Sequence, residues 1–150
     1  MISQTAEYAL RAIVFLAMNP GRAYTTQQIA AGTRVPAPYL AKVLQSLVRS
    51  GLVQSSRGIG GGFLLTVPKE ELTILSVLNA VDPIERVKEC PLGLESHEGA
   101  LCALHETLDN ATACVEKLFS ETTIADILNT RTGSTPLCEQ MPGTQAVSCA

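Results

Sequence analysis

Polar and basic side chains able to hydrogen bond to DNA lie together in one stretch of the sequence. Between residues 39 and 49, apolar residues recur at helical spacing, at Leu40, Val43, Leu44 and Leu47. The opposite face of this predicted helix carries Tyr39, Lys42, Gln45 and Arg49. Arg57 follows in a glycine-rich segment. Donors on a helix beside an arginine-bearing hairpin are typical of a winged helix on DNA.

The glycine-rich segment is predicted to be the tip of a β-hairpin. Gly51 ends the preceding helix, and we expect strands at residues 52–55 and 63–67 with the tip at residues 57–62. Four of the five residues from 58 to 62 are glycine. A nucleotide-binding glycine loop would open a helix, whereas a strand pattern follows here, so a hairpin is favoured. Glycines at its tip let backbone amides approach DNA closely.

Cysteines form the second group of residues with chemical capacity. The sequence holds five of them: Cys90, Cys102, Cys114, Cys138 and Cys149. Their number is odd and they lack the density of a disulfide scaffold, so reactive or metal-ligating cysteines are favoured. Cys90 or Cys102 beside His105 could instead be the nucleophile of an enzyme, but the sequence offers no acid–base set beyond that pair.

Two earlier helices must position the polar helix. Apolar residues with helical period span about residues 3–18, where Glu7 reads as a solvated carboxylate of the first turn. Thr25 and Gln28 have the spacing of a capping box, which starts a second helix. Residues 33–36 form a turn, and Pro38 suits the first turn of the next helix. The order helix, turn, helix and wing is typical of DNA-binding domains. The alternative is a helical hairpin that serves only the packing of the core.

The second half of the chain is predicted to carry a long helix that needs a partner. Thr73 can cap a short helix that ends near Val81, and a loop spans residues 82–100. From about residue 101 the apolar positions alternate spacings of three and four, which indicates a coiled-coil seam: Leu101, Leu104, Leu108, Ala111, Val115 and Leu118. Thr122 or Thr123 caps a last helix at residues 124–128. We expect residues from about 129 onward to form a disordered tail.

Length and charge indicate one domain with an appendage. The 150 residues are 46% hydrophobic with a net charge of −3, which argues against wholesale disorder and a uniformly basic coat. Residues 1–69 contain seven basic residues and one acidic residue, whereas residues 70–150 contain four basic and 13 acidic residues. The first half is therefore suited to phosphate. The apolar run at residues 12–18 is too short to span a bilayer and lacks the preceding charge of a signal peptide, so a cytoplasmic protein is expected.

Several motifs together resemble one protein family. They are YLAKVL at 39–44, GLV at 51–53, RGIGGGF at 57–63, LTILSV at 72–77, CALH at 102–105 and TIADIL at 123–128. These motifs resemble the Rrf-two family of bacterial winged-helix transcriptional regulators, which includes the iron-sulfur-assembly repressor and the nitric-oxide-sensing repressor. The resemblance covers about residues 1–130. It implies a mainly α fold with a small β wing and a long dimerisation helix.

The resemblance implies a homodimer on a double-stranded DNA operator. Recognition helices would enter adjacent major grooves while the wings reach the flanking minor groove. The residues expected at DNA are Gln27, Pro38, Tyr39, Lys42, Gln45, Arg49, Arg57 and Gly60. Ala41 stands where some members place an acidic residue that discriminates between operator types. Loss of that carboxylate should relax base discrimination rather than weaken binding.

The resemblance also implies an iron–sulfur cluster. Many family members hold one with three cysteines, five residues between each pair, and a nearby His or acid. Cys90 and Cys102 match the outer two positions and His105 matches a following histidine, but Ser96 replaces the middle cysteine, with His97 adjacent as an alternative ligand. In some members an acidic residue at the position of Glu7 ligates the cluster of the partner subunit.

Mixed ligation favours a two-iron over a four-iron cluster. Buried thiols without a cofactor are the alternative. Cys114 would lie about 18 Å along the helix from Cys102, too far to share the site.

The sequence therefore predicts a dimeric, sequence-specific transcriptional repressor and not an enzyme. Its expected parts are a winged helix-turn-helix domain at residues 1–82, a sensor loop and dimerisation helix at 83–130, and a disordered tail at 131–150. Loss of a redox- or nitric-oxide-sensitive cluster would free the Cys90–Cys102 loop and move the dimerisation helix relative to the wing. The rivals are a cofactor-free regulator of the same fold that answers to a metabolite or protein, and, more remotely, a cysteine-dependent enzyme.

Overall fold

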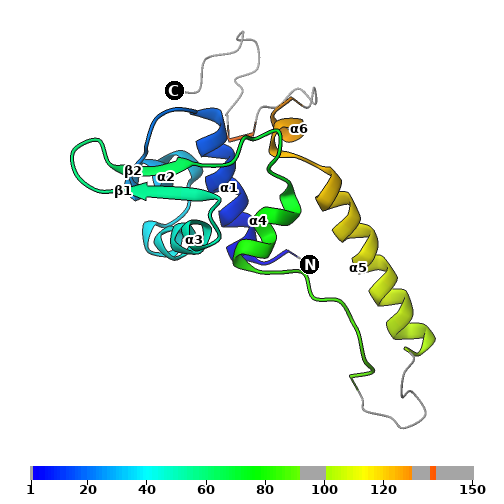
Figure 1. Ribbon diagram of the computed structural model, residues 1–150. Helices are drawn as coiled ribbons and strands as arrows, with labels where there is room; N and C mark the ends of the chain where they lie inside the picture. Colours follow the sequence, from blue (N-terminus) through cyan, green and yellow to red (C-terminus); the bar gives the residue numbers. More distant parts are fainter. Residues whose placement is uncertain (1, 92–100, 130–135, 138–150) are drawn as a thin grey trace, which may run out of the picture.

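Helix α1 (Gln4–Met18) lies at the centre of a computed structural model of the protein, which describes residues 2–91, 101–129 and 136–137. The helix begins because the Ser3 hydroxyl accepts a hydrogen bond from Ala6 N at 3.1 Å. It ends where the Asn19 side chain donates to Phe15 O and Gly21 adopts φ +77°. Helix α1 contacts α2, α3, α4, α6 and β2, so the core is built around it (Figure 1).

Helix α2 (Thr26–Thr33) starts with the predicted capping box. Gln28 N donates to Thr25 Oγ1 at 3.3 Å, and Thr25 N donates to Gln28 Oε1 at 2.9 Å. The buried Thr33 hydroxyl donates to Ile29 O, so its polar atom is satisfied inside the core. Both observations confirm that the second helix is specified locally.

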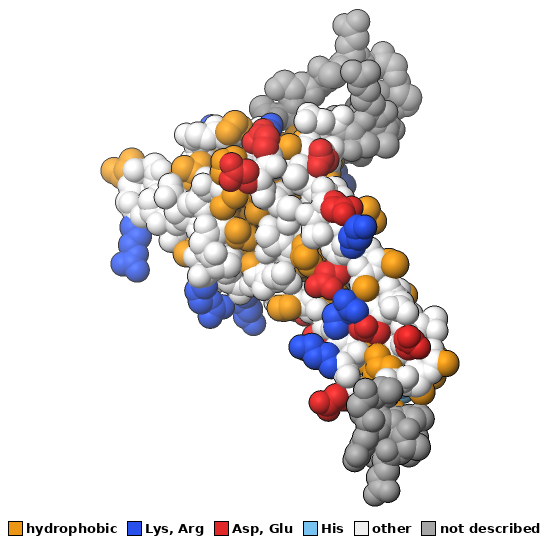
Figure 2. Space-filling view, turned by 45° about the vertical axis from the view of Figure 1, so that its right-hand side comes forward, with side chains coloured by type: hydrophobic (Ala, Val, Ile, Leu, Met, Phe, Trp, Pro, Cys, Tyr) orange, Lys and Arg blue, Asp and Glu red, His pale blue; other side chains and the backbone are white. Residues whose placement is uncertain are grey.

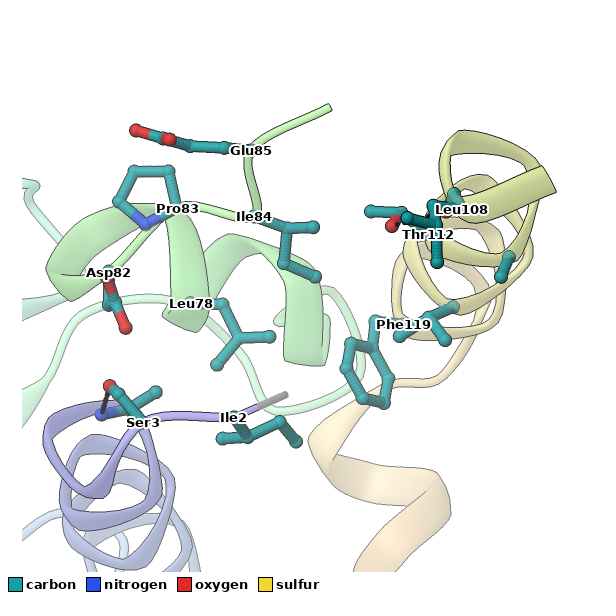
Figure 3. Close-up of a pocket in the computed structure, with 13 residues that line it drawn as sticks. Ile2, Ser3, Leu78, Asp82, Pro83, Ile84, Glu85, Leu108, Thr112 and Phe119 are labelled. Carbon is teal, nitrogen blue, oxygen red and sulfur yellow. Dashed lines mark hydrogen bonds between the residues drawn. The ribbon is translucent and has the colours of Figure 1, made fainter. Parts of the chain in front are cut away.

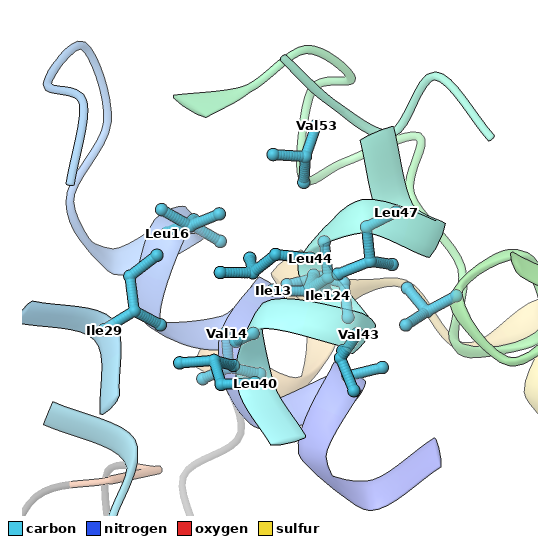
Figure 4. Close-up of a cluster of buried hydrophobic side chains, with 14 of the residues drawn as sticks. Ile13, Val14, Leu16, Ile29, Leu40, Val43, Leu44, Leu47, Val53 and Ile124 are labelled. Carbon is cyan, nitrogen blue, oxygen red and sulfur yellow. The ribbon is translucent and has the colours of Figure 1, made fainter. Parts of the chain in front are cut away.

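Helix α3 (Ala37–Arg49) buries the apolar stripe predicted for it. Leu40, Val43, Leu44 and Leu47 are each at most 4% exposed. They pack with residues of α1, α2, β1 and α6 in the cluster drawn in Figure 4. The burial of this stripe sets the rotation of α3 and turns its polar face outward.

A Schellman motif joins α3 to the wing. Leu52 N donates to Leu47 O at 3.1 Å, and Gly51 N donates to Val48 O at 3.0 Å. The first strand was predicted at residues 52–55, but β1 runs Val53–Ser56, because the Leu52 amide closes the helix instead of starting the ladder. Strand β2 is Gly62–Leu65 rather than residues 63–67 and pairs antiparallel with β1, Val53 opposite Leu65 and Ser56 opposite Gly62.

A two-residue bridge fixes the wing to the body of the domain. Tyr24 N donates to Phe63 O at 3.0 Å and Phe63 N donates to Tyr24 O at 2.8 Å. A Cβ on Gly62, which has φ +152°, would lie 2.5 Å from Tyr24 O. Only glycine therefore allows the approach of these two segments.

Of the last three helices, the first and the last pack against the core, and the middle one extends away from it. Helix α4 (Ile74–Val81) is capped by Thr73 as predicted, α5 (Ala103–Glu121) extends away from the domain, and α6 (Ile124–Asn129) packs back with Ile124 fully buried. Cys102 is the N-cap of α5, so Leu101, which was predicted on this helix, precedes it. Thr123 N donates to Asp126 Oδ2 and Asp126 N to Thr123 Oγ1, so Thr123 caps α6.

The predicted division of the chain at residue 82 falls directly after α4, and it stays a prediction. The predicted tail lies almost entirely outside the described residues. Within the described ranges, no helix combines the length and apolar character needed to cross a membrane.

Candidate DNA-binding surface and candidate metal site

The outward face of α3 exposes the side chains predicted to contact DNA. Tyr39 is 61% exposed, and Lys42, Gln45 and Arg49 are also exposed. One Arg49 nitrogen donates to Ser46 Oγ at 3.1 Å, which orients the guanidinium along the helix. Because the opposite face is buried, these side chains project together from one rigid helix.

The wing tip presents Arg57 and Gly60 to solvent. Gly58 and Gly60 have φ +95° and +78°, and Gly61 N donates to Gly58 O at 3.0 Å to close the turn. Ile59 between them is fully exposed, which leaves an apolar side chain at the tip beside the arginine. No sequence pattern marks Ile59, and its full exposure is visible only in the structure.

Gln27 and Pro38 are also exposed, in the first turns of α2 and α3. Figure 2 shows Lys and Arg side chains projecting from the side of the molecule that carries the wing and α3, whereas basic and acidic side chains lie together along the arm that carries α5. The structure thus exposes all eight predicted DNA residues. Their contacts with DNA stay a prediction.

Two thiols and one imidazole, separated in sequence, come together at the start of α5. Cys102 Sγ lies 3.3 Å from His105 Nδ1, and Cys90 Sγ lies 4.0 Å from the same nitrogen. Neither cysteine forms a disulfide bond within the described residues, and both are partly exposed. We name Cys90, Cys102 and His105 the thiol–imidazole cluster. The structure therefore assembles three of the four residues predicted to bind metal.

The fit of this cluster to an iron–sulfur group is partial. Thiolate and imidazole are suitable ligands for such a group. Both thiols contact one ring nitrogen, however, and among the described residues no group of three or more His, Cys, Asp or Glu has an arrangement that could hold a metal ion. Ser96 and His97 lie outside the described residues. A further ligand would have to come from there or from a partner subunit.

Glu7 does not join the cluster within one chain. Its carboxylate pairs with Arg11 at 2.5 Å along the exposed face of α1. Cys114 is exposed on α5. The proposed reach of Glu7 to a partner subunit stays a prediction.

An ion pair that sequence patterns did not reveal lies beside the cluster. Arg86 Nε and Nη2 donate to the two Asp109 oxygens at 2.6 and 2.5 Å, and Val87 N donates to Asp109 Oδ1 at 3.0 Å. Arg86 Nη1 also approaches Glu116 Oε2 at 3.4 Å. The hydrogen bond from Arg86 lowers the pKa of Asp109 below its usual value, although desolvation opposes the shift. The paired carboxylates raise the pKa of Arg86.

A mainly apolar groove separates α5 from the domain. Its volume is about 660 Å³. Figure 3 shows Ile2, Leu78 and Ile84 on one side and Leu108, Thr112 and Phe119 of α5 on the other. No residue of α5, which the structure describes throughout, is buried. Its apolar stripe, Leu104, Leu108, Ala111, Val115 and Leu118, therefore stays largely uncovered, with Leu104 64% and Leu118 59% exposed and Val115 partly buried.

Comparison with protein families finds one match across most of the chain. The family model described as Rrf2, iron-dependent transcriptional regulator, matches residues 2–130. A protein of Aquifex aeolicus named HTH-type transcriptional regulator is 30% identical over 132 residues, which cover 86% of this chain and 92% of that protein. An HTH-type transcriptional regulator of Mycobacterium tuberculosis is 35% identical over 128 residues, covering 84% and 80% of the two chains.

Solved structures with a similar fold are also transcription factors. CymR (YrzC), the global cysteine regulator of B. subtilis, superposes with a TM-score of 0.71 at 26% identity and covers 85% of this chain and 95% of its own. IscR of T. potens gives a TM-score of 0.70 at 21% identity, covering 85% of each chain, a likeness that shows the fold alone. The relatives and these neighbours are regulators rather than enzymes.

Proposed function

The chain belongs to the Rrf2 family of transcriptional regulators, and from this membership we propose that it is a sequence-specific DNA-binding repressor that acts as a homodimer in the cytoplasm. This membership confirms the resemblance inferred from the sequence motifs, and the winged-helix fold is likewise confirmed. The chain is not an enzyme, as predicted, because its relatives are regulators.

The polar face of α3 beside the wing carries the proposal for DNA. A helix whose other face is fully buried can enter the major groove only with Tyr39, Lys42, Gln45 and Arg49 forward. Arg57 on the wing is then placed to reach the flanking backbone or minor groove. Backbone contacts position the protein while the groove-facing donors read bases.

Selection from a random duplex library tests sequence-specific binding. We expect the wild-type protein to enrich a pseudo-palindromic site, because two copies related by a twofold axis read two half-sites. Fluorescence anisotropy should then show tighter binding to the selected duplex than to a scrambled duplex at the same salt concentration. Equal binding to both would contradict sequence-specific recognition.

The uncovered apolar stripe of α5 and the groove beside it support the homodimer. A second copy can place its own α5 against this stripe and fill the groove, which removes apolar surface from water. Sedimentation equilibrium should give twice the chain mass of 15.9 kDa. A monomer at micromolar concentration that still binds DNA with full affinity would overturn this part of the proposal.

The repressor role rests on the resemblance to repressors of this family. Transcription in vitro from a promoter that overlaps the selected site should fall as the protein is added. A promoter with the site moved upstream of the polymerase footprint is the control, because occupancy there does not block initiation. Increased transcription from the overlapping promoter would identify an activator instead.

A metal-sensing role is the second part of the proposal, and the assembly of the thiol–imidazole cluster carries it. Cys90 and Cys102 would hold an iron–sulfur cluster as thiolates, with His105 as the imidazole ligand. Such a cluster supplies redox- and nitric-oxide-sensitive chemistry when it is bound. Cys90 lies in the loop after α4 and Cys102 caps α5, so a bond between them through any bridging group would tie that loop to α5.

Anaerobic purification tests this second part. The visible spectrum and iron content of the wild-type protein should show a cluster, and Cys90→Ser should remove it. Colourless, iron-free protein whose DNA binding still responds in the cell, and is unchanged by Cys90→Ser, would identify the cofactor-free regulator that answers to a metabolite or protein.

A further inference from the structure

We propose that Arg86 and Asp109 are positioning residues that hold Cys90 against His105 and so assemble the thiol–imidazole cluster. This inference rests on the proposed sensing role of that cluster and goes beyond it by naming the contact on which the cluster depends. The two residues lie 23 positions apart and join the loop after α4 to the second turn of α5.

The geometry makes this contact an anchor for the loop. The Asp109 carboxylate accepts both Arg86 nitrogens and the Val87 amide, so one side chain restrains two consecutive residues of the loop. Paired hydrogen bonds between guanidinium and carboxylate fix orientation as well as distance. The Asp109 side chain is only 16% exposed, so dissolved salt screens the attraction between Arg86 and Asp109 less than it would screen a fully exposed pair.

The anchor and the cluster lie one helical turn apart. Asp109 follows His105 by four residues on α5, so both side chains lie on the same side of the helix. Cys90 follows Val87 by three residues, and its sulfur lies 4.0 Å from His105 Nδ1. Residues 87–90 therefore run back along α5 from Asp109 to His105.

Chain length explains why the anchor matters. Helix α4 ends at Val81, nine positions before Cys90, whereas the anchor holds Val87, only three positions before Cys90. A shorter tether raises the effective concentration of Cys90 at Cys102 and His105. Loss of the anchor should therefore weaken any ligand that must bridge both thiols, while ligands of one thiol should be unaffected.

Phenylarsine oxide is a suitable probe because it bridges two nearby thiols. Its arsenic forms two As–S bonds, one to each sulfur, and its oxygen leaves as water with the two thiol protons, so no oxidant is needed. The background chain carries Cys114→Ser, Cys138→Ser and Cys149→Ser, which leaves Cys90 and Cys102 as the only thiols. Mass spectrometry measures how many molecules of the arsenical bind each chain, and competition with a small dithiol measures the affinity of the chain for it.

We expect Asp109→Ala and Arg86→Met to lower the affinity for the arsenical by roughly tenfold, through the loss of effective concentration. Asp109→Asn should lose less, because its amide oxygen can still accept from Val87 N. Glu121→Gln is the matched control, since it removes the Lys117–Glu121 pair at 3.9 Å on the same helix without touching the loop. Alkylation of single thiols by iodoacetamide should be similar in all variants.

Two results would overturn the inference and tell its failures apart. If Asp109→Ala, Asp109→Asn and Arg86→Met, with circular dichroism matching the parent, bind the arsenical as tightly as Glu121→Gln, the anchor is not needed and the sensing role is untouched. If the parent binds no better than its Cys90→Ser derivative, the cluster is not assembled, and the anchor and the thiol-based sensing role both fail. Sequence-specific DNA binding is measured separately and survives either result.

Discussion

Single residues on the candidate DNA-binding surface differ in what they are expected to contribute. Lys42 and Arg57 carry charge at the two edges of that surface, one on α3 and one on the wing, and both are exposed. Ile59 and Gly60 beside Arg57 contribute shape instead of charge. Residues of these two kinds should therefore be distinguishable by the salt dependence of binding.

Lys42→Ala and Arg57→Ala should each weaken binding to the selected duplex and lower the slope of log affinity against log salt by about one, since one phosphate contact is lost. Lys117→Ala removes an equally positive but distant side chain on α5, 76% exposed, and should leave the slope unchanged. Anisotropy titrations over a range of salt concentrations measure the slope. An Arg57→Ala slope equal to that of wild type would remove the wing arginine from the interface.

Gly62→Ala should destabilise the wing more than Gly60→Ala does. A Cβ at position 62 meets the Tyr24 backbone at 2.5 Å, whereas the Cβ at position 60 meets no atom within 4 Å. Gly60→Ala carries only the left-handed strain of about 1–2 kcal/mol. Thermal unfolding followed by circular dichroism compares the two variants, and equal melting temperatures would show that the Tyr24–Phe63 bridge yields easily.

Among the helices, α3 and α5 are both amphipathic, but their apolar faces differ in burial. The apolar face of α3 is buried against α1, whereas the apolar face of α5 stays uncovered in the single chain. Substitutions on the two faces should therefore act on different equilibria. Changes in α3 should affect folding, and changes in α5 should affect assembly.

Leu108→Glu should convert the proposed dimer to a monomer without unfolding the winged-helix domain. Leu108 is 50% exposed and lines the groove, so a carboxylate there costs little in the single chain but opposes burial by a second copy. Lys117→Glu, on an open part of the same helix, is the control and should stay dimeric. Leu44→Ala should instead cost about 2–5 kcal/mol of folding free energy, because it empties a fully buried site. Sedimentation and thermal unfolding separate the two effects.

At the scale of the whole molecule, opposite charge divides the chain. The basic first half presents its positive side chains with α3 and the wing, and the acidic second half holds α5. The polarity should orient the protein on DNA with α5 away from phosphate. Acidic groups in the second half also bind the loop to α5 and cap α6, so they couple stability to pH.

Stability should fall in acid as Asp109 is protonated. Its pKa lies below the ordinary 3.8, chiefly through the hydrogen bond from Arg86, so the folded state binds this proton less readily than the unfolded state. The stabilisation is therefore complete above about pH 4 and is lost as the pH falls through the lower folded pKa. Melting temperatures of wild type and Asp109→Asn should differ near neutral pH and converge in strong acid. A constant difference at every pH would contradict this role of the carboxylate.

Features that depend on near neighbours could be predicted from the order of the residues. The Thr25–Gln28 capping box, the Thr73 cap and the Gly51 terminus involve hydrogen bonds between residues at most five positions apart. The buried stripe of α3 follows from helical period alone. Strand bounds were one or two residues off, because the competing use of the Leu52 amide by α3 is a matter of geometry and not of composition.

Contacts that close long stretches of chain became visible only in the folded molecule. The Tyr24–Phe63 bridge and the Arg86–Asp109 pair join residues 39 and 23 positions apart. The approach of Cys90 to His105, 15 positions apart, was expected only from the family resemblance and not from any local pattern. No local pattern predicts such pairs. Closing these loops costs conformational entropy, and packing elsewhere in the fold offsets that cost. Helix α5 is a similar case. The sequence predicts its apolar stripe, but the exposure of that stripe in the single chain depends on the core, which α1 and α4 fill without α5.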